Sequence, residues 1–482
     1  MSKKITQILI ILFLPMLVIS QESIKPNSLF YTPQKTGRMW DTWMYYENDT
    51  YYLYYLITKN SPGEGIALAT SKDGVNWNEI GLIFPKSDSA QWLGTGSIWK
   101  PKPGTTDKKY ILNYSEWYGQ AFDKGQQRIF FAGSNDLIHW EKMKNTFEPD
   151  SNFYKVNKGN GSRWDCIYSF PNEKGGRYGY WTANPKDFHP GFGFGETLDG
   201  IHWKALPAPK IEWGNEPKMD NIEAGAVEKI NGKYYMMAGT WDRYKGNYGM
   251  VTFIADQPSG PFRPAKKNLF ILASPPGLGH TYFARFLPIK NEVLINHQSI
   301  KENWGKVHFG LLKKAVVDKE GTLRMGYWEG NEKYKGSSIP IKASKQDFNR
   351  RINFIDATLN LNEGLILECN FPSTLQDDKS SIYFSLSDTN GLSISLNSKG
   401  KVEFGITNLD GSVYKSLESI NREINFSSKP LLKLFIKQSF LELYIDDILI
   451  QCYSFQSNPS GKIGFSIMKN LLPENLKAWY VK

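Results

Sequence analysis

One polar turn recurs along the chain at an equal spacing. The segments ATSKDGVNW, AGSNDLIHW and GETLDGIHW end at Trp77, Trp140 and Trp203, which lie 63 residues apart, and weaker copies end at Phe262 and Trp328. Between these turns, pairs of apolar and aromatic stretches begin at five positions: Asp41, Ser97, Asp165, Glu223 and His280. A unit of about 60 residues with four strands predicts one blade of a β-propeller.

We therefore expect an all-β fold with two domains. A five-bladed β-propeller is predicted over residues 28–340 and an antiparallel β-sandwich over residues 345–482, joined by the segment 337–348. The composition agrees, because 15 Trp, 26 Tyr and 28 Phe favour strands, and 42 Gly and 25 Pro favour turns. After residue 345 short Ser- and Asn-rich turns separate the strands, a pattern typical of a sandwich.

The first 20 residues have the pattern of a signal peptide. Lys3 and Lys4 precede an apolar run of about 13 residues, and the small residue Ser20 follows it. That run is too short to span a bilayer comfortably, and no later segment is apolar enough to do so. We therefore expect an exported protein, periplasmic or secreted, with no transmembrane segment once the signal peptide is removed.

Charge and cysteine content exclude further classes. The formal net charge of +10 could favour an acidic substrate, but scattered solvated lysines explain it as well, and no Arg-rich run indicates nucleic-acid binding. The three cysteines, Cys166, Cys369 and Cys452, have no metal-ligand spacing, so we expect neither a metal nor another cofactor. Cys369 and Cys452 either pair across strands or remain thiols.

Three of the five strand-opening residues are carboxylic acids: Asp41, Asp165 and Glu223. In a propeller the first strand of each blade lines the central channel, so the starts of these strands converge on one face. Acids are rarely buried unless they are paired or used. Two converging carboxylates, one as proton donor and one as nucleophile or base, are what glycoside hydrolysis requires. The other reading is a structural ring of hydrogen bonds.

Aromatic and polar residues near the same strand starts suit sugar binding, because sugar rings stack on aromatic faces and guanidinium groups bind hydroxyls. The predicted substrate-binding residues are Trp40, Ser97, Trp99, Trp117, Arg163, Trp181, Trp241 and His280.

These motifs resemble those of the five-bladed glycoside hydrolases of families 32 and 43. GTGSIW (Gly94 to Trp99) is similar to a Gly-Ser motif of family 32, SRWDC to its Arg-Asp-Pro motif, and LKLFIKQSFLELYIDD to its sandwich ladder. The resemblance implies that Asp41 is nucleophile or base, Asp165 is transition-state stabiliser or pKa modulator, and Glu223 is general acid. Family 32 has Asn-Asp-Pro-Asn-Gly where this chain has MWDTWM, and Glu-Cys-Pro where it has IEAGAV, so its fructose-reading residues are not visible here.

Three functions remain open from the sequence. The first is a glycosidase, exo-acting on a poly- or oligosaccharide. The second is a non-catalytic carbohydrate-binding propeller, which the loss of one acid would favour. The third is a glycoside phosphorylase or transferase on the same scaffold, which would need a basic phosphate pocket.

Overall fold

A computed structural model describes residues 29–482, except 59–62, 119–126, 157–162, 217, 243–246, 275–279, 301–306, 343–351, 372–379, 398, 409–413, 456 and 467–471. The predicted signal peptide lies outside the described residues. Among those residues no helix is long and apolar enough to cross a membrane. The chain is built almost entirely of antiparallel strands, with a short 3-10 helix, η2 (Glu329–Tyr334).

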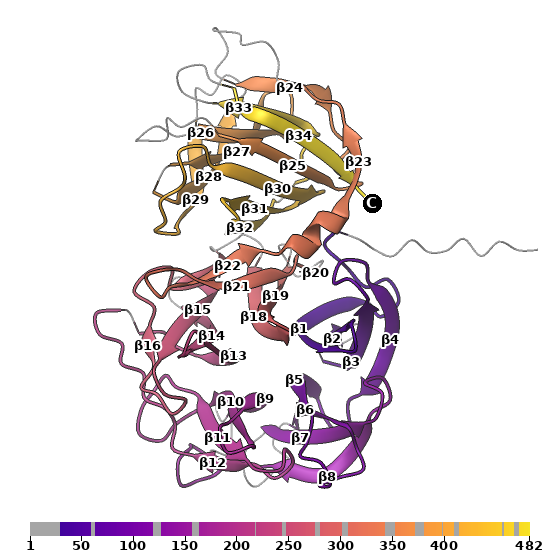
Figure 1. Cartoon of the computed structure of the whole chain (residues 1–482), viewed down its shortest axis with the longest axis vertical. Helices are drawn as coiled ribbons and strands as arrows, with labels where there is room; N and C mark the ends of the chain where they lie inside the picture. The colour runs from indigo at the N-terminus through magenta and orange to yellow at the C-terminus, as the bar shows by residue number, and fades with distance from the viewer. Residues whose placement is uncertain are drawn as a thin grey trace, which may run out of the picture.

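Four separate sheets follow one another along the chain (Figure 1). The first is β1 (Arg38–Glu47), β2 (Thr50–Thr58), β3 (Gly65–Ser71) and β4 (Asn78–Pro85). The second is β5 (Trp92–Trp99), β6 (Tyr110–Trp117), β7 (Gln127–Ser134) and β8 (Glu141–Phe147). The third is β9 (Trp164–Pro171), β10 (Arg177–Ala183), β11 (Gly193–Thr197) and β12 (Lys204–Leu206). The fourth is β13 (Glu223–Ile230), β14 (Lys233–Asp242), β15 (Asn247–Ala255), β16 (Arg263–Pro264) and β17 (Phe270–Ser274).

The fifth predicted unit is not a separate sheet. It consists of β18 (His280–Ile289), β19 (Glu292–Ile300), β20 (Val307–Phe309), β21 (Lys313–Val317) and β22 (Leu323–Tyr327). A single pair, Gly326 with Ile448, joins it to the sandwich in one eleven-stranded sheet. The expected order of propeller and sandwich is thus confirmed, whereas five separate blades are not, because the fifth unit shares its edge with the second domain.

The sandwich has two layers. The larger sheet continues through β32 (Ile448–Ser454), β31 (Phe440–Ile445), β30 (Leu431–Lys437), β25 (Leu365–Asn370), β34 (Glu474–Val481) and β23 (Lys335–Ile339). The opposing sheet is β24 (Asn353–Thr358), β33 (Lys462–Ser466), β26 (Ser380–Ser385), β27 (Asn390–Leu396), β28 (Lys401–Asn408) and β29 (Tyr414–Asn421). Aliphatic and aromatic side chains of both layers fill the space between them, and Cys369 lies among these side chains.

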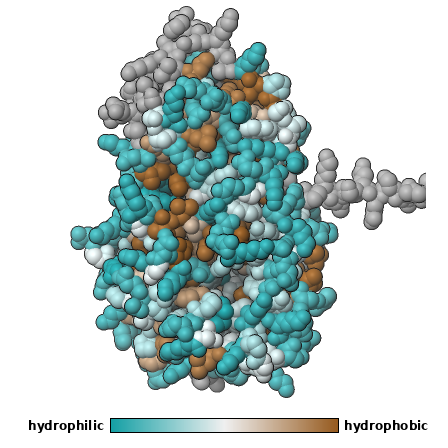
Figure 2. Space-filling view, viewed as in Figure 1, coloured by the Kyte–Doolittle hydropathy of each residue, from teal (hydrophilic) through white to brown (hydrophobic). Residues whose placement is uncertain are grey.

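The apolar side chains gather in several cores. One lies between the first and second sheets, one between the second and third, one between the third and fourth, and a large one joins the first and fifth units to the sandwich. Cys452 belongs to that large core, so it and Cys369 face different interiors and form no disulfide. On the face shown in Figure 2 hydrophilic residues dominate and hydrophobic ones form small patches.

The recurrent turn of the sequence joins the third and fourth strands of the first three sheets. In each copy an aspartate Oδ1 accepts two backbone N–H groups, and a Ser or Thr hydroxyl oxygen accepts another. The aspartates are Asp73, Asp136 and Asp199. The tryptophan that ends the turn then packs inward, as Trp77 does at 2% exposure. The repeat is therefore a hydrogen-bonded cap on the outer hairpin of each sheet.

Candidate active site

The first strands of the five units contact one another in a closed ring: β1 with β5, β5 with β9, β9 with β13, β13 with β18, and β18 with β1. Each of these strands has a register shift near its start, against its neighbour in the same sheet. Three residues at the shifts have positive φ: Asp41 at 42°, Cys166 at 37° and Phe283 at 59°. Because a β-bulge redirects the side chains beside it, the ring turns this band of residues toward one cavity.

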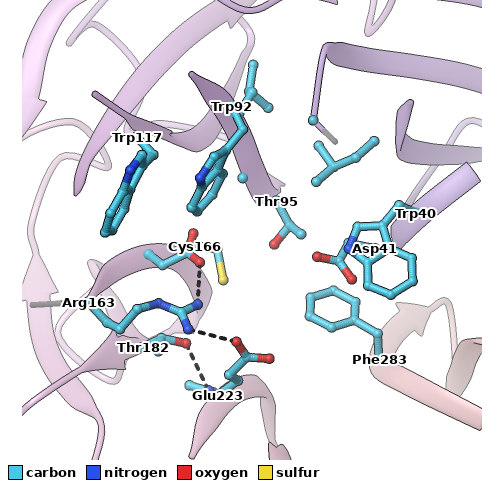
Figure 3. Close-up of a pocket in the computed structure, with 16 residues that line it drawn as sticks. Trp40, Asp41, Trp92, Thr95, Trp117, Arg163, Cys166, Thr182, Glu223 and Phe283 are labelled. Atoms are coloured by element: carbon cyan, nitrogen blue, oxygen red, sulfur yellow. Dashed lines mark hydrogen bonds and ion pairs between the residues drawn. The ribbon is translucent and has the colours of Figure 1, made fainter. Parts of the chain in front are cut away.

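That cavity has a volume of about 510 Å³ and lies where the predicted acids converge (Figure 3). Asp41, Asp165 and Glu223 all line it, from β1, β9 and β13. The remaining lining residues are Trp40, Leu56, Gly63, Trp92, Leu93, Gly94, Thr95, Trp117, Arg163, Cys166, Thr182, Ala224 and Phe283. The structure therefore brings together the three carboxylates that the sequence placed on separate blades.

Arg163 joins two of the acids. Its Nη2 lies 2.9 Å from Asp165 Oδ2 and its Nη1 lies 2.9 Å from Glu223 Oε1. The side chains of these acids are 11% and 18% exposed, so the charge pairs are largely shielded from water. Asp165 and Glu223 consequently lie side by side across one guanidinium, whereas Asp41 points into the cavity from another side (Figure 3).

The second sheet holds Asp165 in place. Ser115 on β6 donates its hydroxyl to Asp165 Oδ1, and Gln127 Nε2 donates to the Ser115 oxygen at 3.1 Å. Gly94 leaves the room for this contact, because a Cβ at that position would lie 2.8 Å from Asp165 Oδ1. The Gly-Ser motif seen in the sequence thus has a steric reason.

Asp41 is held on the opposite side by the fifth unit. Gln298 on β19 accepts the Thr42 N–H at 3.1 Å, which turns its amide nitrogen to within 3.5 Å of Asp41 Oδ1. Burial, followed by the charges of Glu223 and Asp165, raises the pKa of Asp41 well above its usual range. The guanidinium groups of Arg285 and Arg163 oppose that rise.

An aromatic wall faces the acids. Trp92 and Trp117 are cross-strand partners on β5 and β6, and their rings stack with centroids 5.6 Å apart and planes within 9°. Trp40 and Phe283 lie beside Asp41 (Figure 3). The three tryptophans are partly exposed, and such aromatic faces next to carboxylates offer a sugar both a stacking surface and hydrogen-bond acceptors.

The structure separates the other predicted binding residues into two groups. Trp40, Trp117 and Arg163 line the cavity, as expected. Ser97, Trp99 and Trp181 do not: their side chains are buried beneath it, and Trp99 Nε1 donates to the Gly200 carbonyl at 2.8 Å. Trp99 and Trp181 pack in the core between the second and third sheets, and the Ser97 hydroxyl donates to the Ile167 carbonyl on β9, so these three side chains support the strands. The side chains of Trp241 and His280 lie outside the described part of the structure.

Among the lining residues that sequence reasoning missed are Trp92, Thr95, Cys166, Thr182 and Phe283. Trp92 could have been found as the first residue of the strand that carries the Gly-Ser motif. The other four follow from the bulges, for which a sequence gives little signal. The Cys166 side chain remains a thiol at neutral pH, since burial raises its pKa to about 12.

A cluster of metal-ligand types lies elsewhere, at the propeller–sandwich junction. His297, Glu442 and Cys452 approach one another there, but Lys313 Nζ lies between them, 2.6 Å from His297 Nε2 and 2.7 Å from Glu442 Oε2. The ammonium group thus takes the place that a cation would need.

Comparison with known proteins agrees with this geometry. The sequence model of glycosyl hydrolases family 43 matches residues 30–271, just over half of the chain. No curated protein matches this chain. The matching family is thus 43, although the motifs favoured family 32.

Solved structures share the fold over both domains. A sucrose-6-phosphate hydrolase from Lactobacillus gasseri aligns with a TM-score of 0.70 at 14% identity, covering 95% of this chain and 93% of that one. A family 32 β-fructofuranosidase from Bombyx mori, in complex with sucrose, gives 0.71 at 13%, covering 95% and 94%. An exo-inulinase from Aspergillus awamori gives 0.68 at 15%, covering 95% and 98%. At these identities the likeness is one of fold, whereas the family model covers the three strands that carry the acids, β1, β9 and β13. The chain belongs to family 43 of the glycosyl hydrolases, and it is a glycosidase.

Proposed function

We propose that this protein is an exo-acting glycosidase in which Asp41 is the nucleophile or general base, Glu223 is the general acid and Asp165 is the stabilising acid. The observation that carries the proposal is the meeting of three carboxylates from separate strands in one cavity, with Arg163 between two of them. The cavity has a volume of about 510 Å³, within the range of small-molecule sites, and we propose that it receives one end of a glycan chain. We also propose that the enzyme is exported and uses its five strand units as one five-bladed propeller.

The proposed mechanism gives each of the three acids a different role. A sugar that stacks against the aromatic wall would place its anomeric carbon between Asp41 and the Asp165–Glu223 pair. Glu223 would then protonate the leaving oxygen while Asp41 attacks the anomeric carbon or activates a water. The negative charge of Asp165 would stabilise the oxocarbenium-like transition state. Arg163, which forms an ion pair with Asp165, would fix the orientation of its carboxylate.

The test separates acid catalysis from binding. The protein lacking residues 1–20 is screened on sucrose, inulin and a panel of plant, algal and microbial glycans. For the sugar it cleaves, Glu223→Ala should lose at least ~100-fold more kcat/KM on the natural glycan than on an aryl glycoside, because an activated phenol needs little protonation. External azide should restore turnover of that variant on the aryl substrate if the mechanism is retaining.

Glu228→Gln is the matched control. Glu228 lies on the same strand, accepts a hydrogen bond from Tyr168 at 2.7 Å and does not line the cavity. Its removal should leave the ratio of the two activities unchanged. Equal losses on both substrates in Glu223→Ala would reassign Glu223 to binding. Glycan binding without hydrolysis, or turnover that requires phosphate, would favour the carbohydrate-binding or phosphorylase reading.

A further inference from the structure

The proposed role of Asp41 needs an ionised carboxylate, yet its surroundings disfavour one. Asp41 lines the cavity together with two other carboxyl groups, that of Glu223 from β13 and that of Asp165 from β9. Two cations face it as well, Arg163 at the start of β9 and Arg285 from β18. Whether Asp41 can act as nucleophile or base depends on which of these cations is free to balance it.

Arg163 already forms ion pairs with the other two acids, Asp165 and Glu223. Each of its terminal nitrogens lies 2.9 Å from one of the other two acids. Its positive charge is therefore directed at two other carboxyl groups rather than at Asp41.

Arg285 is held differently. The side chain is 1% exposed, and all its hydrogen bonds go to uncharged acceptors: the Gly96 carbonyl at 2.9 Å, Thr95 Oγ1 at 2.9 Å and Cys166 Sγ at 3.3 Å. Its guanidinium carbon lies 4.7 Å from the centre of the Phe283 ring. Among the described residues, no carboxylate lies within ion-pair distance of it.

A buried charge without an ion pair is costly, so its surroundings must compensate for it. Thr95, Cys166 and Phe283, which hold Arg285, all line the cavity. The guanidinium consequently lies directly behind the cavity wall, on a unit whose first strand, β18, contributes none of the three acids. The three acids line the cavity on the other side of this wall, and the charge of Arg285 acts on Asp41 among them.

We propose that Arg285 is a positioning residue that acts through Asp41: a fixed, buried positive charge that keeps the Asp41 carboxylate ionised while Glu223 and Asp165 share Arg163. This inference rests on the proposed function of Asp41. Because Arg285 is separated from the cavity by its own ligands, it acts by its charge and does not touch the substrate.

The pH dependence of kcat/KM tests this role. Arg285→Met removes the charge, so the acidic limb of the profile should move up by about one pH unit or more. The loss at pH 5 should then exceed the loss at pH 8 by about tenfold. Arg285→Lys keeps a charge, and its acidic limb should stay near that of the wild type even if its melting temperature falls. Arg285→Gln also removes the charge while keeping a donor for the Gly96 carbonyl, and it replaces the Met variant if that one does not fold.

Arg422→Met is the control for loss of a buried arginine. Arg422 is 2% exposed and donates to the carbonyls of Ile450 and Phe270, far from the cavity. Arg422→Met should lower the stability of the protein without moving the acidic limb of the pH profile of kcat/KM. The inference is overturned if the charge-removing variants lose activity equally at all pH values, or if Arg285→Lys shifts the limb as far as Arg285→Met. A wild type that hydrolyses no glycoside overturns the proposed function as well, whereas an active wild type with an unmoved limb overturns only the role of Arg285.

Discussion

Asp41 illustrates how a single residue can be useful to an enzyme and costly to its fold. Folding raises the pKa of Asp41, so the native state holds its proton more tightly than the unfolded chain does. Stability contributed by this residue is therefore present below the ordinary pKa of 3.8 and is lost as the pH rises through the folded value. At neutral pH the ionised carboxylate destabilises the protein.

Asp41→Asn should consequently raise the melting temperature at pH 7 and change it little at pH 3.5. The same variant should lose at least ~100-fold in kcat, because the working carboxylate is gone. Thermal unfolding at the two pH values, together with kinetics, checks both parts. A variant that is less stable at pH 7, or that keeps more than about a tenth of the activity, would contradict this account of Asp41.

Single residues were predictable where their chemistry is rare and less so where only their direction matters. Three acids at strand starts stand out in a sequence because buried acids need a reason. Trp99 and Trp181 belong to the same aromatic pattern as Trp117, yet only Trp117 lines the cavity. A one-residue bulge changes which side chains of a strand point into the channel, and the sequence gives little indication of where such a bulge lies.

At the scale of the element, the capped turn was the most predictable feature. Its Ser or Thr and its Asp are spaced for hydrogen bonds with nearby backbone N–H groups, and its Trp follows at a fixed position. The sequence pattern alone therefore predicts the turn. The weaker copies lie in corresponding places with other bonds: Asp256 pairs with Arg263, and Asp318 accepts the N–H groups of Glu320 and Thr322. A local motif can be predicted from the sequence because its hydrogen-bonding residues are close neighbours in the chain.

Substitution of Asp199 tests how much such a turn contributes to the stability of the fold. Its Oδ1 accepts the N–H groups of Ile201 and His202, each at 2.8 Å, and these bonds together with the His202 ring help lower its pKa to about 2. Asp199→Ala should reduce the free energy of unfolding at pH 7 by about 2 kcal/mol, as measured by denaturant unfolding. The effect should vanish as the pH falls from 4 toward 2, because the depressed pKa stabilises the fold only above the unfolded value. Asp187→Ala, at an exposed loop residue, should cost nothing, and a similar loss there would point to a non-specific charge effect.

At the scale of the whole molecule, the sequence predicted two domains but not how they are joined. The junction is a buried polar cluster in which Lys313 Nζ from the propeller lies 2.8 and 2.7 Å from the two carboxylate oxygens of Glu442 in the sandwich. Leu311 N–H and the Tyr444 hydroxyl also donate to Glu442. These partners are more than a hundred residues apart in the chain or lie on alternate positions of unremarkable strands, so no local pattern reveals them.

This cluster should make the two domains unfold as one unit near neutral pH. Lys313→Met leaves the buried Glu442 carboxylate without its cation and should cost about 3–5 kcal/mol, whereas Lys313→Met combined with Glu442→Leu should recover most of that loss. Acid should weaken the junction even in the wild type. The pKa of His297 is lowered, first by burial and then by Lys313, and the pKa of Glu442 is lowered to about 2, chiefly by Lys313 and His297 against its burial. Both groups stabilise the fold above their unfolded values, so that stability is lost as the pH falls below about 6.5 and again below about 4.5. Calorimetry should show one transition at pH 7.5 and a lower, broader one at pH 4. A double variant no more stable than Lys313→Met alone would mean that Lys313 and Glu442 do not act as a pair.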